Sequence, residues 1–287
     1  MLARTRLRIR KVVRSARLAC RNRWSHAPVT TPGRPTVSMT SHGRRLRLVH
    51  LALESIAAGS VRPGRLVLWL DDLDVVSHPT PGLRRLIARG LEVHPTVDLK
   101  PHKKYYPYVQ SIERHVAPLV TADDDLMYPV DWLETLLDAH AGDPSTNTAH
   151  RARAVRTDAE GRIAPYADWR AARPGASSPR HLATGNWGHV IVPTMLDALR
   201  DREAEFLADA PTADDLWLHR VAVELGVAPK VTGTYTVDDF LHLPDGGSSL
   251  ADANVDGSGN DRQIRAAWPA GVVATIAGTP PVHVTRS

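Results

Sequence analysis

The chain has 287 residues, 43% apolar and 23% charged, which is typical of a globular domain large enough to bury a substantial core. A single cysteine, Cys20, excludes an internal disulfide framework and a zinc site built on several cysteines. The net charge of +5 is uneven: residues 1–23 carry eight arginines and Lys11, so removing these nine charges leaves −4 elsewhere. This distribution argues against a nucleic-acid-binding surface spread over the fold, and no nucleic-acid partner is expected.

Residues 1–35 are predicted as a basic N-terminal tail and linker. In residues 1–23 apolar side chains alternate with arginines, so the continuous apolar centre of a signal peptide is lacking. No run in the sequence approaches the roughly 18 apolar residues that cross a bilayer. Two interpretations of residues 1–23 stay open: a basic segment that rests on anionic lipid, or a disordered arm. Residues 24–35 are rich in Pro, Thr and Gly and are typical of a linker.

From residue 36 to about residue 140, strand and helix patterns alternate. Strands are predicted at residues 37–40, 65–70, 91–94 and 117–122, and helices at 46–58, 81–89, 105–115 and 129–140. Such alternation predicts an α/β fold with a mostly parallel sheet flanked by helices.

The second half is less regular. Strands are expected at residues 149–155 and 189–192, helices at 193–200, 213–225 and 261–268, and a mobile loop at 244–260. We therefore expect one domain over residues 36–287, with a first half at 36–145 and a second at 146–287.

Three polar clusters stand where predicted strands end: residues 38–42, Asp71-Asp72 and Asp123-Asp124-Asp125. In open parallel sheets, ligands bind beyond the carboxyl ends of the strands, so these clusters mark a candidate site. Adjacent carboxylates repel one another and need a compensating cation, and oxygen ligands suit Mg²⁺ or Mn²⁺. The alternative is a solvated acidic turn that binds no metal.

Four segments carry a family resemblance: VSMTSHGRR, LVLWLDD, VTADDDLMYPVDWLETLL and PTADDLWLH. They resemble bacterial family 2-type glycosyltransferases that act on surface polysaccharides, which have the GT-A (Rossmann-like) fold. The resemblance implies a metal-dependent transferase, using Mn²⁺ or Mg²⁺, that moves a sugar from a UDP- or GDP-sugar to a glycan or lipid-linked acceptor, with inversion. It also implies an irregular, acceptor-side second half after the nucleotide-sugar half. The expected location is cytoplasmic, peripheral at the inner face of the membrane.

The same resemblance assigns donor-side roles. The aspartate cluster corresponds to the family's DxD motif, with Asp123 and Asp125 as metal ligands and Asp123 and Asp124 also contacting the donor. The remaining donor-binding residues implied are Ser38, Thr40, Ser41, Arg44, Asp71, Asp72, Lys103 and Lys104. Lysines near a diphosphate offset its charge, although the two lysines could also form a solvated helix start.

On the acceptor side, the segment PTADDLWLH resembles the acidic motif of inverting enzymes. It implies Asp215 as the base that takes the acceptor's proton, with Asp214 as a helix cap or supporting residue. Trp187 could stack on a sugar or be a core tryptophan. The other acceptor-side residues implied are Gly185, Asn186, Asn260, Asp261 and Gln263.

Two rival functions stay open. A metal-dependent sugar nucleotidyltransferase also uses aspartates and a nucleotide. Such enzymes usually begin with a phosphate loop rich in glycine and arginine, to which His42-Gly43-Arg44-Arg45 is only weakly similar. A non-catalytic module that binds a glycan or a membrane surface is the second rival. The presence of both acidic segments argues against that module.

Overall fold

The computed structural model describes residues 2–243 and 259–278, with side chains from residue 5 onward. In chain order its elements are α1 (Leu2–Trp24), β1 (Thr36–Thr40), η1 (Gly43–Arg47), α2 (Val49–Ala57), β2 (Arg65–Leu70), α3 (Leu73–Ser77), α4 (Pro81–Ile87), β3 (Leu91–Pro95), η2 (Lys100–Lys104), α5 (Tyr106–Gln110), β4 (Leu119–Ala122), β5 (Leu126–Met127), α6 (Trp132–Ala141), β6 (Thr148–Ala149), β7 (Ala152–Ala154), η3 (Tyr166–Asp168), β8 (Arg170–Ala171), β9 (His181–Ala183), η4 (Gly185–Trp187), β10 (His189–Ile191), α7 (Pro193–Asp201), α8 (Phe206–Asp209), α9 (Asp214–Glu224), β11 (Lys230–Val231), β12 (Leu241–His242), α10 (Gly259–Ala267) and α11 (Ala270–Ala277).

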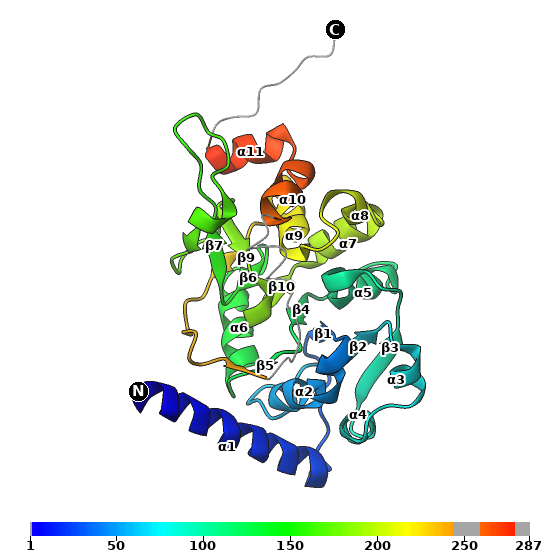
Figure 1. The fold of residues 1–287 in the computed structure, drawn as a ribbon. Helices are drawn as coiled ribbons and strands as arrows, with labels where there is room; N and C mark the ends of the chain where they lie inside the picture. The colour runs from blue at the N-terminus through cyan, green and yellow to red at the C-terminus, as the bar shows by residue number, and fades with distance from the viewer. Residues whose placement is uncertain (1, 244–258, 279–287) are drawn as a thin grey trace.

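A seven-stranded sheet forms the centre of the fold, in the order β11-β6-β10-β4-β1-β2-β3 (Figure 1). Strand β1 pairs in parallel with β2 and β4, and β2 pairs in parallel with β3. Strand β10 runs antiparallel to both of its neighbours. The predicted α/β class with a mostly parallel sheet flanked by helices is therefore confirmed. Because β1, β2 and β4 are parallel, their carboxyl ends share one edge of the sheet.

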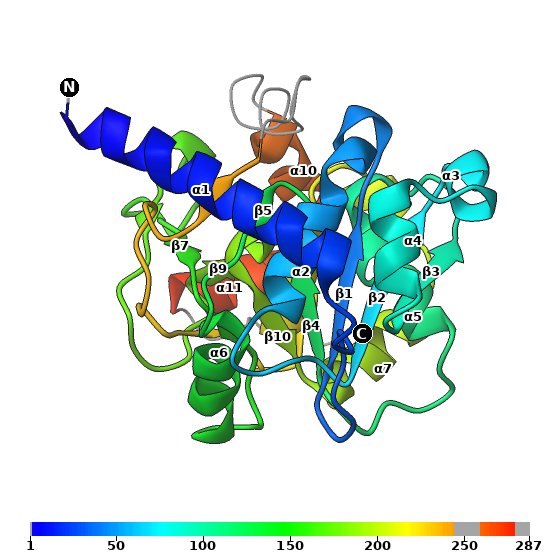
Figure 2. The ribbon, with the colours of Figure 1, turned by 90° about the horizontal axis from the view of Figure 1, so that it is seen from below.

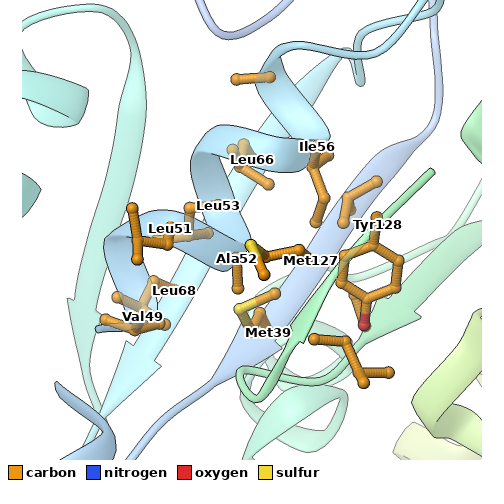
Figure 3. Packing of buried hydrophobic residues seen from close by; sticks show 14 of the residues in the cluster. Met39, Val49, Leu51, Ala52, Leu53, Ile56, Leu66, Leu68, Met127 and Tyr128 are labelled. Carbon is orange, nitrogen blue, oxygen red and sulfur yellow. The ribbon is translucent and has the colours of Figure 1, made fainter. Parts of the chain in front are cut away.

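Two hydrophobic cores lie on opposite faces of this sheet, because successive strand residues point to opposite sides. In β2, Leu66 and Leu68 belong to the core under α2, whereas Val67 belongs to the core under α5, α7 and α9. Figure 3 shows the first of these cores, where α2 side chains pack over β1 and β2 and meet Met127 and Tyr128. The packing on both faces holds the strand ends in place, and those ends carry the candidate site.

The predicted strands and helices of residues 36–140 correspond to observed elements, with helices shorter than predicted and with β1 and β3 one residue longer than predicted. The helix expected at 105–115 is limited to α5, which ends where the Ser111 hydroxyl bonds the carbonyl of Tyr108, 2.8 Å away. The strand expected at 149–155 is two strands in different sheets, β6 and β7. Most of the loop expected at 244–260 lies outside the described residues, and its last two residues begin α10.

The predicted basic tail forms a helix, α1, that packs on α2 and α4 (Figure 2). Its Leu18 is buried, and Val29 of the following segment is fully buried in the same core. The fully buried Glu54 carboxylate of α2 pairs with Arg89 at 2.8 Å and with Arg21 of α1 at 2.9 Å. We call these three charged residues the Glu54 cluster; together they tie α1 to the domain. None of the helices in the described part of the chain is long and apolar enough to cross a membrane.

Candidate active site

The end of β1 turns toward the aspartates that follow β4. The Ser41 hydroxyl donates to Asp124 Oδ2 at 2.5 Å, and Arg45 Nη1 lies 3.0 Å from Asp124 Oδ1. The same nitrogen lies 3.5 Å from Asp125 Oδ2. Because β1 and β4 are adjacent parallel strands, the turn after one strand reaches the turn after the other. Asp124 is thus a buried carboxylate held by two donors from η1 and the end of β1.

The backbone of the aspartate turn is clamped by Tyr128. Its hydroxyl oxygen accepts the Asp123 N–H at 2.7 Å, and lies 3.1 Å from the Asp123 carbonyl and 3.2 Å from the carbonyl of Asn186. Tyr128 is fully buried among the side chains shown in Figure 3. This clamp fixes where the carboxylates of Asp123 and Asp125 point, which a metal or phosphate site requires.

Lys104 joins the two acidic segments of the sequence. Its buried ammonium nitrogen lies 2.8 Å from Asp123 Oδ1 and 3.0 Å from Asp214 Oδ2. Burial acts to lower the pKa of Lys104, but Asp123, Asp214 and Asp215 outweigh it and raise that pKa well above its usual value. Residues at the end of β4 and at the start of α9 therefore meet around one cation that is permanently charged.

Asp214 and Asp215 open α9 but differ in their surroundings. Burial acts to raise the pKa of Asp214, but Lys104 and His102 outweigh it, so this pKa lies below its usual value. Burial and the neighbouring Asp214 instead raise the pKa of Asp215 to about 8. Asp215 is half-buried, and its Oδ1 accepts the Gly185 N–H at 3.0 Å. One carboxylate is thus a fixed anion and the other a strong base at an accessible position.

Gly185 is needed where η4 passes the acidic residues. A Cβ atom at this position would lie 3.3 Å from both Lys104 Nζ and Asp215 Oδ1. Such contacts are tighter than ordinary van der Waals distances, so a side chain would displace one of the two groups. The glycine therefore lets the backbone of η4 approach Asp215 and donate to it.

Negative charge exceeds positive charge around Lys104. We define the acidic cluster as the five aspartates at this edge of the sheet: Asp123, Asp124, Asp125, Asp214 and Asp215. Only Arg45 and Lys104 pair with these carboxylates in the contacts found among the described residues. Burial and the neighbouring Asp123 raise the pKa of Asp125 to about 6, and burial also raises the pKa of Asp124. The cluster therefore favours a further cation.

The cluster fits a divalent cation that keeps most of its coordination sites for other ligands. In the described part of the chain, no group of three or more His, Cys, Asp or Glu side chains is arranged to hold a metal by itself. Mg²⁺ is commonly bound through one or two carboxylates plus phosphates and water. Asp123 and Asp125, with their oxygen donors and excess charge, match this pattern.

Other predicted donor-side residues lie along the same sheet edge but are engaged in the fold. Ser38 accepts the indole N–H of Trp69 at 3.1 Å, and Thr40 donates to the Trp69 carbonyl at 2.8 Å. Lys103 Nζ lies 2.8 Å from Asp71 Oδ1, on the β2 side, away from Lys104's partners.

Asp72 and Arg44 sit in the turns that follow two of these strands. Asp72 caps α3 by accepting the Val75 N–H at 3.1 Å. Arg44 is exposed in η1, next to the arginine that faces the aspartates. Their donor-binding roles stay predictions.

The acceptor-side residues divide into two groups. Asn186 and Gly185 lie in η4 beside the acidic cluster, whereas Trp187 is 6% exposed and stacks on Phe240 with ring centroids 4.6 Å apart. The guanidinium of Arg151 lies 5.1 Å from the Trp187 ring centroid. Trp187 therefore packs as a core residue in this conformation, which is the second interpretation that its sequence position allowed.

Residues of α10 brace η3 and the loop that precedes Asp214. Asp261 accepts the Tyr166 N–H at 2.8 Å, and Gln263 exchanges two hydrogen bonds of 3.0 Å with Thr212. Asn260 is buried beside them. These contacts position α9 relative to α10, and the acceptor contacts of these three residues stay predictions.

Two residues of the site were missed by the sequence analysis. Arg45 pairs with Asp124 and Asp125, whereas the family resemblance favours its neighbour Arg44; two adjacent arginines after a strand give no signal of which one turns inward. Tyr128 has no predicted role, although its spacing of five residues from Asp123 allows its hydroxyl to return to that backbone.

Comparisons with known proteins give a likeness of fold. No protein-family model and no curated protein sequence matches the chain. Among solved structures, the chain is similar to a mannosyltransferase from Pyrobaculum calidifontis in complex with GDP-Man and Mn²⁺, at 15% identity and a TM-score of 0.46, covering 80% of this chain and 65% of that one. It is also similar to glucosyl-3-phosphoglycerate synthase from Mycobacterium tuberculosis in complex with Mn²⁺, UDP and glucosyl-3-phosphoglycerate, at 13% identity and a TM-score of 0.47, covering 88% and 84%.

A third similar structure is 4-diphosphocytidyl-2C-methyl-D-erythritol synthase from Anaerococcus prevotii, at 11% identity and a TM-score of 0.45, covering 69% of this chain and 85% of that one. The chain thus spans 65% of the length of the mannosyltransferase. At such low identities and TM-scores these likenesses carry no argument about activity, which rests on the site's own geometry.

Proposed function

We propose that the chain is a metal-dependent glycosyltransferase of the GT-A type. It transfers a sugar from a UDP- or GDP-sugar to a glycan or lipid-linked acceptor, with inversion at the anomeric carbon. One observation carries the proposal: Lys104 lies 2.8 Å from Asp123 and 3.0 Å from Asp214. The residues that the family resemblance assigns to the donor and to the acceptor thus share one cation, which supports a direct transfer because the two substrates must meet in such a reaction.

On the donor side, Asp123 and Asp125 would hold Mn²⁺ or Mg²⁺ as a DxD motif. Such a cation, when bound, supplies Lewis-acid stabilisation for charge that grows on the departing nucleoside diphosphate. Arg45 and Ser41 hold Asp124 beneath this pair. The carboxylates are therefore preorganised, so little reorganisation is needed during the reaction.

On the acceptor side, Asp215 is the group that accepts the proton. Its pKa of about 8 makes its ionised form a stronger base than an ordinary aspartate. As the acceptor oxygen bonds to the anomeric carbon, its proton passes to Asp215, and the bond between that carbon and the diphosphate oxygen breaks. Lys104 supplies a permanent positive charge between this base and the donor side, and Asp214 keeps Lys104 in place.

The decisive experiment is a screen of nucleotide sugars for metal-dependent donor hydrolysis and transfer, comparing wild type with Asp125→Ala. We expect activity with Mn²⁺ on at least one UDP- or GDP-sugar. We expect a loss of roughly 100- to 1,000-fold in the variant, because stabilisation by a bound metal contributes several kcal/mol. Asp138→Ala is the matched control, since Asp138 is exposed on α6.

The result would also separate the rival functions. Equal turnover in wild type and Asp125→Ala would remove Asp125 from the metal site. Release of pyrophosphate from a nucleoside triphosphate and a sugar phosphate would instead identify a nucleotidyltransferase. If no combination of Mn²⁺ with UDP, GDP or CTP raised the melting temperature, a non-catalytic binding module would be favoured.

A further inference from the structure

The outer side of α1 carries an exposed apolar stripe. Ile9 is 57% exposed, Val12 is 67% exposed and Val13 is 43% exposed. Ala16 and Cys20 are exposed on the same side. At 100° per residue these positions fall within an arc of about 100°, roughly opposite the side on which Leu18 and Asn22 are buried. Most of the stripe therefore points away from the domain, whereas Val13, at its edge, also lines a cavity beneath the helix.

Arginines border this stripe on both sides. On the helical wheel Arg6, Arg10 and Arg17 fall along one border, and Arg8 falls along the other. Helix α1 contains no acidic residue, and the first acid of the chain is Glu54. The surface is thus an apolar band with three arginines along one border and Arg8 along the other, and Arg23 falls on the apolar arc only in the last turn of the helix. This order matches the acyl region and the phosphates of a bilayer interface.

The border that holds Arg10 and Arg17 lies beside a cavity of about 700 Å³ beneath the edge of α1. Arg10, Arg14, Arg17 and Arg21 line it at spacings of four, three and four residues, so they form a row along the helix. Burial, together with Arg10 and Arg17, lowers the pKa of Arg14 below its usual value. Asp131 and Asp239 line the same cavity, and Arg14 and Arg21 are engaged by the Tyr128 carbonyl and by Glu54. The exposed Arg10 and Arg17 are therefore the members of the row placed to meet the phosphate oxygens of lipid headgroups.

We propose that α1 is an in-plane membrane-docking helix that binds an anionic lipid bilayer, with its apolar stripe in the interface and the exposed arginines at its borders, Arg6, Arg8, Arg10 and Arg17, on lipid phosphates. The end of the helix supports a bilayer as the partner. Trp24 is 70% exposed there, and the Arg23 guanidinium lies 4.6 Å from its ring centroid. Tryptophan and arginine are both favoured at the boundary between lipid and water. Figures 1 and 2 show that the N-terminal part of α1 projects beyond the rest of the fold, so a flat surface can reach it.

Docking through α1 also orients the candidate active site. Ser15 lies 3.5 Å from Met127, and Arg14 donates to the carbonyl of Tyr128, directly after the acidic turn. The Glu54 cluster ties the other end of α1 to α2 and α4. A bilayer bound to α1 therefore holds the sheet edge in one orientation relative to the membrane, which would suit a lipid-linked acceptor if the proposed transferase function holds.

The first test is co-sedimentation of the full chain with vesicles of phosphatidylcholine alone or of phosphatidylcholine with phosphatidylglycerol. We expect binding to the anionic vesicles that weakens as salt rises. Arg10→Gln with Arg17→Gln should weaken it about fivefold per arginine, and Ile9→Ser with Val12→Ser by at least about tenfold. Val97→Ser with Val116→Ser is the matched control, because both residues are exposed and lie outside α1. Thermal unfolding checks that each variant folds.

The second test uses Cys20, the only cysteine of the chain, as the site of a polarity-sensitive fluorophore. Anionic vesicles should shift its emission to the blue, whereas a label at Val116→Cys in a Cys20→Ala background should not shift. An unshifted Cys20 label, binding equal on neutral vesicles, or no difference between the stripe and control pairs would each overturn the proposal. So would a stable dimer whose formation buried the label instead. The assay contains no nucleotide, metal or acceptor, so its failure is distinct from a failure of the transferase assignment.

Discussion

The fold contains two clusters of charged residues that differ in their balance of negative and positive charge. In the Glu54 cluster one carboxylate is met by two guanidinium groups, and Asn22 adds a hydrogen bond at 3.3 Å. In the acidic cluster five carboxylates are met by Arg45 and Lys104 within the described residues. The first group is balanced by the protein itself, whereas the second leaves negative charge uncompensated.

The difference separates charges that hold the fold from charges that await a ligand. Taking a carboxylate out of water costs several kcal/mol, so an unbalanced cluster persists only where something else stabilises it or where function retains it. The raised pKa values of Asp125, about 6, and of Asp215, about 8, are the mark of that imbalance. Neutralising a carboxylate of the Glu54 cluster should therefore destabilise the fold, whereas neutralising a carboxylate with a raised pKa in the acidic cluster should stabilise it.

The largest expected effect on stability comes from a substitution in the Glu54 cluster. Glu54→Gln should lower the free energy of unfolding by about 3–5 kcal/mol, because the buried Arg89 would keep its charge without a counter-ion and the partly exposed Arg21 would lose its partner. Denaturant unfolding measures this change. Donor hydrolysis per folded molecule should stay unchanged, since the ion pairs of Glu54 found among the described residues are with Arg21 and Arg89 and not with the acidic cluster.

The control for this substitution is an exposed pair of the same chemistry. Arg65 and Glu92 make hydrogen bonds of 2.8 and 2.7 Å at the surface, so Glu92→Gln should cost less than about 1 kcal/mol. Similar losses for Glu54→Gln and Glu92→Gln would mean that burial does not distinguish the two pairs, and the comparison between the clusters would fail.

Substitutions at the neighbouring residues Asp214 and Asp215 should change the stability of the fold in opposite directions. Asp214→Asn removes a counter-ion of Lys104 and should destabilise the fold by about 1–3 kcal/mol, because Asp123 remains as a partner. Asp215→Asn should raise the melting temperature by a few degrees near pH 8 while transfer is lost, because an amide is not forced to ionise in this setting.

The sign follows from linkage between protonation and folding. The folded-state pKa of Asp215, about 8, lies above its unfolded value of 3.8, so wild-type stability falls as pH rises between these values. The advantage of Asp215→Asn should therefore grow from about pH 5 to pH 8 and then level off. Asp214 has a lowered pKa, so its contribution to the stability of the fold is present near neutral pH and is lost only in acid. A melting-temperature difference for Asp215→Asn that does not change with pH would show that Asp215 is not the raised carboxyl.

Most of the fold could be predicted where strand and helix patterns are long. Residues 65–70 form a near-continuous apolar run, broken only by the exposed Arg65, because β2 is covered on both faces; Thr80-Pro81 correctly marks the start of α4. The second half was harder, because β6, β8 and β11 have two residues each and carry no periodic signal. Such short strands are defined by their partners in the sheet rather than by their own sequence.

The site could be predicted in part for the same reason. Acidic residues at the end of an apolar strand are visible in the sequence, so the strand pattern alone singles out residues 123–125. The partnership of Lys104 with Asp214, more than a hundred residues apart, depends on how η2 and α9 meet over the sheet and has no local signature. The packing of α1 was missed because an arginine-rich segment with scattered apolar residues does not reveal that Leu18 and Arg21 face the domain.

The smallest expected effect comes from Tyr128, whose hydroxyl holds the backbone of the turn at Asp123–Asp125 in place. Tyr128→Phe removes the hydroxyl that binds both the N–H and the carbonyl of Asp123, leaving those groups without this partner. We expect a loss of about 1 kcal/mol in stability and about a fivefold drop in kcat/KM for the donor, because the carboxylates lose orientation rather than charge. Tyr108→Phe is the control, since its hydroxyl makes only a 3.5 Å contact with Thr36 in the other core. If Tyr128→Phe changed stability but not kcat/KM, the Tyr128 hydroxyl would serve the fold alone, as the Glu54 cluster does. A drop in kcat/KM measured per folded molecule would assign the hydroxyl to the function of the acidic cluster, because the orientation of the carboxylates matters only when a ligand must be bound.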